Sequence, residues 1–131
     1  MSVATGRYFE RKAVTYLEHK GHTIIKKNFF TPYGEIDIIS EFENKIYFFE
    51  IKYLSKASLI NPIQKIDRSK IRRIYLSISY LKKFCKIKSY QVDSLCMFFK
   101  SKTLIFEVYQ DLRLVWESFL NLDAGQRKYS L

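Results

Sequence analysis

The sequence predicts an α/β protein in which a mixed β-sheet is packed between helices. Segments with the helical spacing of apolar residues alternate with short β-rich runs, in the order α-β-β-β-α-β-β-α. The chain has 131 residues, of which 47% are hydrophobic, and this is enough for one ordinary core. We therefore predict a single domain over residues 1–122, followed by a polar tail over residues 123–131.

The first predicted element is a helix over residues 3–20. Its apolar and small residues recur at helical spacing, Ser2 can act as the N-cap, and Gly21 marks the end. Glu10 falls on the inward-facing stripe of this helix, where a carboxylate is unexpected. Glu10 is therefore a candidate functional residue.

Three strands are predicted after this helix. A basic run over residues 23–30 predicts the first strand, and Pro32 with Gly34 marks a turn. Residues 35–41 and 45–53 are β-rich and lie close together in the sequence, so they predict an antiparallel hairpin. This hairpin carries most of the candidate chemistry.

The second half of the chain predicts a loop, two helices and two more strands. Asp67 is a suitable N-cap for a helix with an apolar stripe from Ile71 to Leu81. The other elements are a loop over residues 54–66, strands over 89–99 and 103–109, and a short amphipathic helix that carries Leu112, Val115, Trp116 and Phe119. We expect the two strands to join the same mixed sheet.

The charge of the chain points to a polyanionic partner. Lys and Arg outnumber Asp and Glu by 23 to 13, for a formal net charge of +10. Cations on a protein release counterions from a nucleic acid, and this drives binding. A membrane surface is disfavoured, since no helix pairs a basic face with a strongly apolar exposed one. With neither a membrane span nor a signal peptide in the sequence, we expect a cytoplasmic protein.

The hairpin brings two carboxylates and a lysine together. A turn centred on residues 43–44 would place Asp37 directly opposite Glu50, and Lys52 opposite Glu35. Side chains alternate along a strand, so Glu50 and Lys52 share one face. Like charges that face each other are destabilising, so a pair of acids in an apolar hairpin suggests a site for a cation.

This arrangement predicts a magnesium-dependent phosphodiester hydrolase. Mg²⁺, with Mn²⁺ as an alternative, needs only one or two protein carboxylates beside water and substrate phosphate, and Asp37 and Glu50 would supply them. The ion would polarise a phosphoryl oxygen, while Lys52 would stabilise the developing charge or orient the attacking water. Glu10 would reach the same region from the first helix.

These residues resemble the PD-(D/E)xK pattern of the restriction-endonuclease-like superfamily. Across residues 4–98 the chain resembles, more narrowly, the bacterial YraN-like family, which is similar to archaeal Holliday-junction resolvases. The positions that carry this resemblance are Gly6, Glu10, Gly-Glu-Ile-Asp-Ile-Ile over residues 34–39, Phe-Glu-Ile-Lys over residues 49–52, and Lys70. One position departs from the family pattern, because Leu54 stands where a basic residue is usual.

The resemblance implies a fold, an activity and a set of site residues. It implies a restriction-endonuclease-like mixed sheet and a Mg²⁺-dependent endonuclease of DNA processing, repair or recombination. By the resemblance, Glu10, Asp37, Glu50 and Lys52 form the active site, and the main-chain carbonyl of Ile51 adds a metal ligand. DNA is then favoured over RNA as the partner. A homodimer would suit the cutting of two related strands.

A second set of residues predicts contacts with nucleic acid. Lys70, Arg72 and Arg73 lie at the start of a helix, where positive charge opposes the helix dipole. Helix stability does not explain their placement, whereas contact with phosphate would. Lys26 and Lys27 in the first strand are further candidates. A merely solvated basic face is the alternative for each of these residues.

Other functions remain open at the level of sequence. Glu50 and Lys52 can simply solvate one face of a sheet, in which case the fold would be a non-catalytic nucleic-acid-binding module. A third class is a partner protein that serves a DNA-processing assembly through its aromatic side chains. Aromatic residues make up 17% of the chain, and we assign most of them to the core rather than to base stacking.

Overall fold

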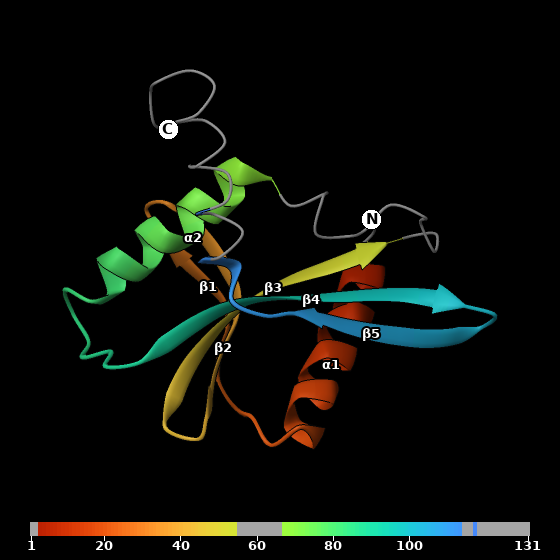
Figure 1. The fold of residues 1–131 in the computed structure, drawn as a ribbon. Helices are drawn as coiled ribbons and strands as arrows, with labels where there is room; N and C mark the ends of the chain where they lie inside the picture. Colours follow the sequence, from red (N-terminus) through yellow and green to blue (C-terminus); the bar gives the residue numbers. More distant parts are fainter. Residues whose placement is uncertain (1–2, 55–66, 114–116, 118–131) are drawn as a thin grey trace.

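The computed structural model describes residues 3–54, 67–113 and 117. It contains a five-stranded sheet with the strand order β1-β2-β3-β4-β5, in which β3 and β4 are parallel and the other neighbours antiparallel. The predicted fold class, a mixed sheet flanked by helices, is therefore confirmed (Figure 1). The elements are α1 (Val3–His19), β1 (Thr23–Thr31), β2 (Gly34–Phe42), β3 (Lys45–Leu54), α2 (Arg68–Leu81), β4 (Tyr90–Lys100) and β5 (Thr103–Tyr109).

The predicted elements agree with these bounds to within about two residues wherever the structure describes them. Leu54 ends β3 rather than opening a loop, and the rest of the predicted loop lies outside the described residues. Most of the predicted last helix and the whole tail over residues 123–131 also lie outside them.

The start of α2 follows the predicted capping pattern. Asp67 has extended backbone angles, and its carboxylate accepts a hydrogen bond of 2.8 Å from the backbone N–H of Ser69. This bond satisfies one of the N–H groups that a helix leaves unpaired in its first turn. Ile71, Ile74 and Ile78 then recur at helical spacing and are all buried, so one face of α2 packs on the sheet.

The two helices cover opposite faces of the sheet and form two separate cores (Figure 1). Successive residues of a strand point to opposite faces, so β3 contributes Phe48 to the core under α2 and Phe49 to the core under α1. Below α2 the buried side chains are Ile36, Ile39, Phe48, Ile71, Ile74, Ile78, Val92 and Leu112; below α1 they are Phe9, Ala13, Leu17, Ile38, Phe49, Leu95 and Met97.

The hairpin of β2 and β3 has the predicted register but is shorter than predicted. Paired residues run from Phe42 and Lys45 beside the turn to Ile38 and Phe49, where the ladder ends. Beyond that point β2 stays paired with β1, while β3 stays paired with β4. The two strands therefore diverge, as Figure 1 shows, and a gap opens in the sheet at Asp37 and Glu50. We call this gap the fork.

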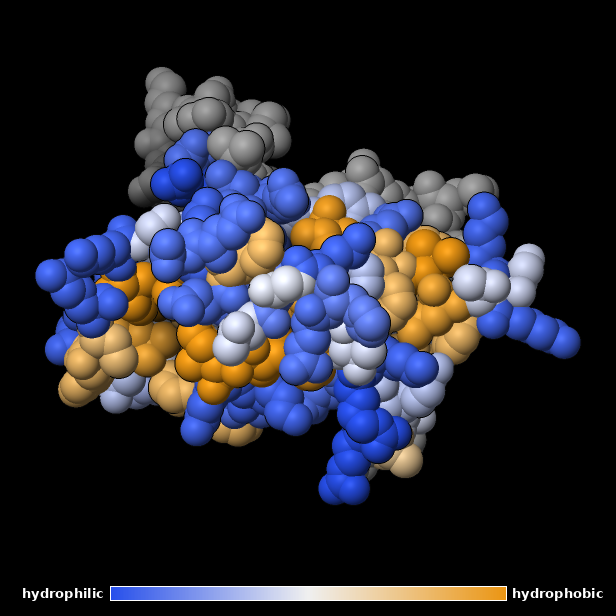
Figure 2. Space-filling model, turned by 90° about the horizontal axis from the view of Figure 1, so that it is seen from below, coloured by the Kyte–Doolittle hydropathy of each residue, from blue (hydrophilic) through white to orange (hydrophobic). Residues whose placement is uncertain are grey.

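The surface on the side of α1 is mixed in character. Figure 2 shows this side in space-filling form, with hydrophobic patches separated by hydrophilic residues. Within the described part of the chain, no helix is both long and apolar enough to cross a membrane.

A buried carboxylate joins the sheet to the segment that follows β5. Asp93 on β4 is only 2% exposed, and its Oδ1 accepts hydrogen bonds of 2.8 Å from Gln91 Nε2 and from the backbone N–H of Asp111. Lys45 Nζ in turn donates to Gln91 Oε1 at 2.7 Å. Burial raises the pKa of Asp93 above its ordinary value, and the two hydrogen bonds offset only part of this effect.

The substitution Asp93→Asn should stabilise the protein at neutral pH. The amide oxygen can accept both hydrogen bonds, and the charge that burial disfavours is gone. Because the folded-state pKa of Asp93 is raised, its favourable contribution is complete at acidic pH and is lost as the pH rises through that value. Urea unfolding of both proteins between pH 4 and 8 should show a stability difference that grows with pH. A difference that stays constant with pH would contradict this account.

Candidate functional site

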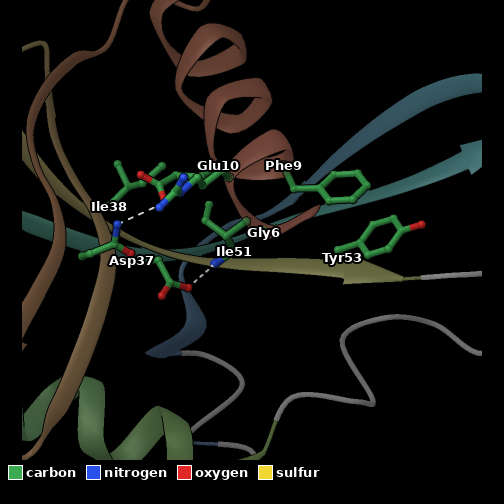
Figure 3. A pocket seen from close by; sticks show the side chains of 9 residues that line it. Gly6, Phe9, Glu10, Asp37, Ile38, Ile51 and Tyr53 are labelled. Atoms are coloured by element: carbon green, nitrogen blue, oxygen red, sulfur yellow. Dashed lines mark hydrogen bonds between the residues drawn. The ribbon is translucent and has the colours of Figure 1, made fainter. Parts of the chain in front are cut away.

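The candidate site lies in the fork, where β2 and β3 no longer share hydrogen bonds. Asp37 uses the gap, because its Oδ2 accepts a hydrogen bond of 2.8 Å from the backbone N–H of Ile51 (Figure 3). The sequence predicted that Asp37 pairs directly with Glu50, and Lys52 with Glu35, in the ladder of β2 and β3. Both predictions are wrong, because the ladder ends at Ile38 and Phe49. A side chain replaces the backbone of β2 as the partner of β3 at this point.

Glu50 is the most unusual side chain of the site. It is 2% exposed, and neither carboxylate oxygen has a hydrogen-bond partner among the described residues. Lys70 Nζ lies 3.2 Å from Oε1 and Lys52 Nζ lies 3.9 Å from it, so the charge of Glu50 is attracted by two ammonium groups. At 3.2 Å the Lys70 ammonium is close enough to donate, but its direction is not that of a hydrogen bond, so the carboxylate keeps unsatisfied lone pairs.

The pKa of Asp37 is shifted by its surroundings in the fork. Burial raises the pKa of Asp37 above its ordinary value, and the negative charges of Glu35 and Glu50 add to the increase. The hydrogen bond from Ile51 and the positive charge of Lys70 act in the opposite direction. Asp37 and Glu50 are therefore electrostatically coupled, although they are not paired in the ladder.

Two hollows meet at Asp37, one on each face of the sheet. The α1-side hollow has a volume of about 430 Å³; Figure 3 shows its lining, which is Gly6, Arg7, Phe9, Glu10, Asn28, Asp37, Ile38, Ile51 and Tyr53. The α2-side hollow has a volume of about 480 Å³ and is lined by Thr31, Pro32, Tyr33, Gly34, Glu35, Asp37, Lys70, Arg73 and Ile74. Because the strands separate here, a ligand can approach Asp37 from either face.

Glu10 belongs to the α1-side hollow rather than to the surroundings of Glu50. Its Oε1 lies 3.5 Å from Lys27 Nζ, and its Oε2 accepts a hydrogen bond of 3.1 Å from Asn28 Nδ2. Asn28 has a positive φ of 51° and lies between two paired residues of β1, at the level of Asp37. The structure thus brings Glu10 and Asp37 to one hollow, but it shows no contact between Glu10 and Glu50.

The predicted phosphate contacts have different positions. Lys70 lies in the site, on Glu50, and Arg73 lines the α2-side hollow, so both can meet a ligand there. Arg72 and Lys26 are exposed outside both hollows, whereas Lys27 pairs with Glu10. The positions of these residues do not test whether they bind nucleic acid, which stays a prediction.

Sequence reasoning missed two features of the site. The first is the ion pair of Lys70 with Glu50, which joins segments that are distant in sequence. The sequence had indicated only a phosphate contact for Lys70. The second is Asn28, which donates a hydrogen bond to Glu10 and was given no role. An asparagine within a β-rich run is a usable signal, since Asn tolerates positive φ better than most residues and often marks an irregular strand.

Some oxygen atoms of the fork suit a hard divalent cation. Both oxygens of Glu50 and Oδ1 of Asp37 make no hydrogen bond within the described residues. The N–H and C=O of one strand residue point to the same side, so the carbonyl of Ile51 also faces the gap that Asp37 enters. No cluster of three His, Cys, Asp or Glu side chains occurs in the described segments, so a cation here would use two carboxylates, a carbonyl and water.

The chain belongs to the uncharacterised protein family UPF0102, the YraN-like family, whose sequence profile matches residues 9–98. It is 41% identical to a UPF0102 protein of Fervidobacterium nodosum, over 66% of this chain and 65% of that protein. It is 42% identical to one of Sulfurihydrogenibium over 53% and 60%, and 32% identical to one of Nitratiruptor over 87% and 96%. The match thus spans less than two thirds of the length of each of the first two relatives.

Replacement of Asp37 should separate its structural role from its charge. Asp37→Ala removes the acceptor of the Ile51 N–H and should lower the free energy of unfolding by about 1 kcal/mol or more. Asp37→Asn keeps an acceptor and removes a charge that burial disfavours, so it should be more stable than the alanine variant. Urea unfolding in EDTA would measure both. Equal stability of the two variants would show that the bond to Ile51 contributes nothing.

Proposed function

We propose that this protein is a metal-dependent nuclease of the restriction-endonuclease-like PD-(D/E)xK superfamily, which hydrolyses phosphodiester bonds of nucleic acid, DNA in the first instance. The observation that carries the proposal is the buried Glu50 carboxylate, which lacks a hydrogen bond on either oxygen and lies beside Asp37. Buried acids are normally hydrogen-bonded, so this arrangement is costly unless a ligand completes it. The membership of UPF0102 supports the assignment of the motif but names no activity.

A divalent cation would complete this arrangement. Glu50 and Asp37 would hold the ion, with the carbonyl of Ile51 as a further donor, and this all-oxygen set suits Mg²⁺ or Mn²⁺. When bound, the ion would polarise a phosphoryl oxygen and make a water molecule more acidic. It would also neutralise two carboxylates that otherwise repel each other and the phosphate.

The lysines of the site have roles that follow from their positions. Lys52 is one-quarter exposed and lies on the same strand face as Glu50, so its ammonium group is within reach of both carboxylate and solvent. From there Lys52 would stabilise negative charge that develops on the phosphate, or orient the attacking water. Lys70 is more exposed and would bind a neighbouring phosphate. Glu10 would support the site from the α1-side hollow.

The substrate would be drawn to the site by the net charge of the protein. The chain carries a formal charge of +10, and a nucleic acid would release counterions on binding. Arg72, Arg73 and Lys26 are exposed, so they can contribute to this attraction at low salt.

Cleavage of nucleic acid should depend on the divalent ion and on the fork carboxylates. We expect the wild-type protein to cut DNA in Mg²⁺ or Mn²⁺ and to be inactive in EDTA. Glu50→Gln and Asp37→Asn should each lower the rate by about 100-fold or more, since each would remove a charged ligand of the ion. The measurement is gel-resolved cleavage of labelled single-stranded, duplex and branched DNA, with the matching RNAs in parallel.

The matched control is Glu41→Gln. It neutralises an exposed carboxylate on β2, the strand that carries Asp37, and lies outside both hollows. It should cleave like the wild type. If the wild type cuts none of these substrates while it still binds them at low salt, the nuclease proposal fails and a non-catalytic binding module takes its place.

A further inference from the structure

Three aromatic side chains form a row on the surface beside the α2-side hollow. Tyr33, in the turn between β1 and β2, lies 6.3 Å from the ring of Tyr80 near the end of α2, and Tyr80 lies 5.1 Å from the ring of Phe84. Tyr33 is 42% exposed and Phe84 is 70% exposed. Tyr80 is half-buried, and none of the three belongs to either core cluster, so the two cores do not account for these rings. We call them the aromatic row.

Hydrogen bonds hold the backbone of the turn that carries Tyr33. Thr31 Oγ1 accepts a bond of 3.1 Å from the backbone N–H of Tyr33 and donates one of 3.1 Å to the carbonyl of Gly34. The same hydroxyl forms a bond of 2.7 Å with the buried hydroxyl of Ser77 on α2. The turn is therefore tied to the helix that carries Tyr80. A surface held in place in this way loses little conformational entropy when it binds a ligand.

The aromatic row is continuous with the candidate site. Tyr33 lines the α2-side hollow together with Arg73, Lys70 and Asp37. A chain-like ligand that rests on Tyr33 can thus also meet the guanidinium of Arg73, the ammonium of Lys70 and the carboxylate of Asp37 within the same hollow. This combination of aromatic rings and cations matches a ligand that carries both flat apolar groups and regularly spaced negative charges.

The charge around the row favours a polyanion. Residues 68–88, which include two of the three rings, contain eight Lys or Arg and no Asp or Glu. Arg72, Arg73, Lys82 and Lys83 in this segment are exposed. Cations interleaved with exposed aromatic rings are the pattern of surfaces that bind single-stranded nucleic acid, where phosphates meet the cations and bases stack on the rings.

We propose that the aromatic row binds unpaired bases and directs single-stranded nucleic acid along the α2-side hollow to the fork. The proposal deepens the proposed function and rests on it for the identity of the reaction. Unpaired bases are required because a duplex already stacks both faces of its internal bases, so a protein ring can stack only on a base that is not stacked on its neighbour. The favoured substrate is therefore a single strand or an unpaired region beside a duplex.

Binding in the absence of catalysis tests this proposal. Fluorescence anisotropy in EDTA would compare a labelled single-stranded 20-nucleotide DNA with the duplex of the same sequence, for the full chain and its variants. Tyr33→Ala and Phe84→Ala should each weaken single-strand binding by about 5-fold or more, the effect of losing one stacked base, and should change duplex binding little. Phe84→Tyr should bind like the wild type because the ring is kept.

Two further variants are controls. Phe30→Ala removes a ring that is 72% exposed but lies outside the row and the hollow, so its effect on binding should be small. Arg73→Gln should lower the dependence of affinity on salt by about one unit of log–log slope, whereas the row variants should leave that slope unchanged. Circular dichroism of each variant would confirm that the fold is intact.

The outcomes separate this proposal from the nuclease proposal. If Tyr33→Ala and Phe84→Ala lose no more affinity than Phe30→Ala, or lose the same factor on duplex, the aromatic row does not bind unpaired bases. A contact with another protein would then account for the exposed rings. If the row variants behave as expected and no substrate is cut in Mg²⁺ or Mn²⁺, only the nuclease proposal fails.

Discussion

The divergence of β2 from β3 after Ile38 and Phe49 is the constraint on which the candidate site depends. Each strand keeps its other neighbour, so the sheet stays intact on both sides while its centre opens. The backbone groups released by this opening need new partners, and the carboxylate of Asp37 supplies one for Ile51. The hydrogen bond that gives Ile51 a new partner therefore also holds the Asp37 carboxylate in a gap that both hollows reach.

Burial and charge act together on the acids of the fork. Glu50 lies in the core-facing layer of β3, where a carboxylate without hydrogen bonds is destabilising, and the ammonium of Lys70 offsets part of that cost. Burial and the neighbouring acids also raise the pKa of Asp37. Buried carboxylates that repel each other are common at sites that bind a cation, because the bound ion neutralises their charge.

The fold class and the bounds of the described helices and strands could be predicted from local sequence patterns, whereas the roles of the candidate site residues stay predictions. Periodicity located the helices and strands, and the hairpin register follows from its two-residue turn, which holds Glu43 and Asn44 at positive φ. The end of the ladder at Ile38 could not be predicted, because beyond it β2 follows β1 and β3 follows β4, and these pairings form only in the folded sheet. The contact of Lys70 with Glu50 and the row of Tyr33, Tyr80 and Phe84 were equally hidden, since each joins segments that only the tertiary fold brings together.

Binding of Mn²⁺ to the full chain tests the central claim, that the fork is a cation site, without any need for a substrate. The electron paramagnetic resonance signal of free Mn²⁺ would be followed in a titration of the wild type, Glu50→Gln and the exposed control Glu41→Gln. We predict that the wild type and Glu41→Gln remove Mn²⁺ from solution at one site per chain, and that Glu50→Gln does not, because the proposed site relies on the buried carboxylate of Glu50 as a charged ligand. Equal binding by Glu50→Gln and the wild type would contradict the account.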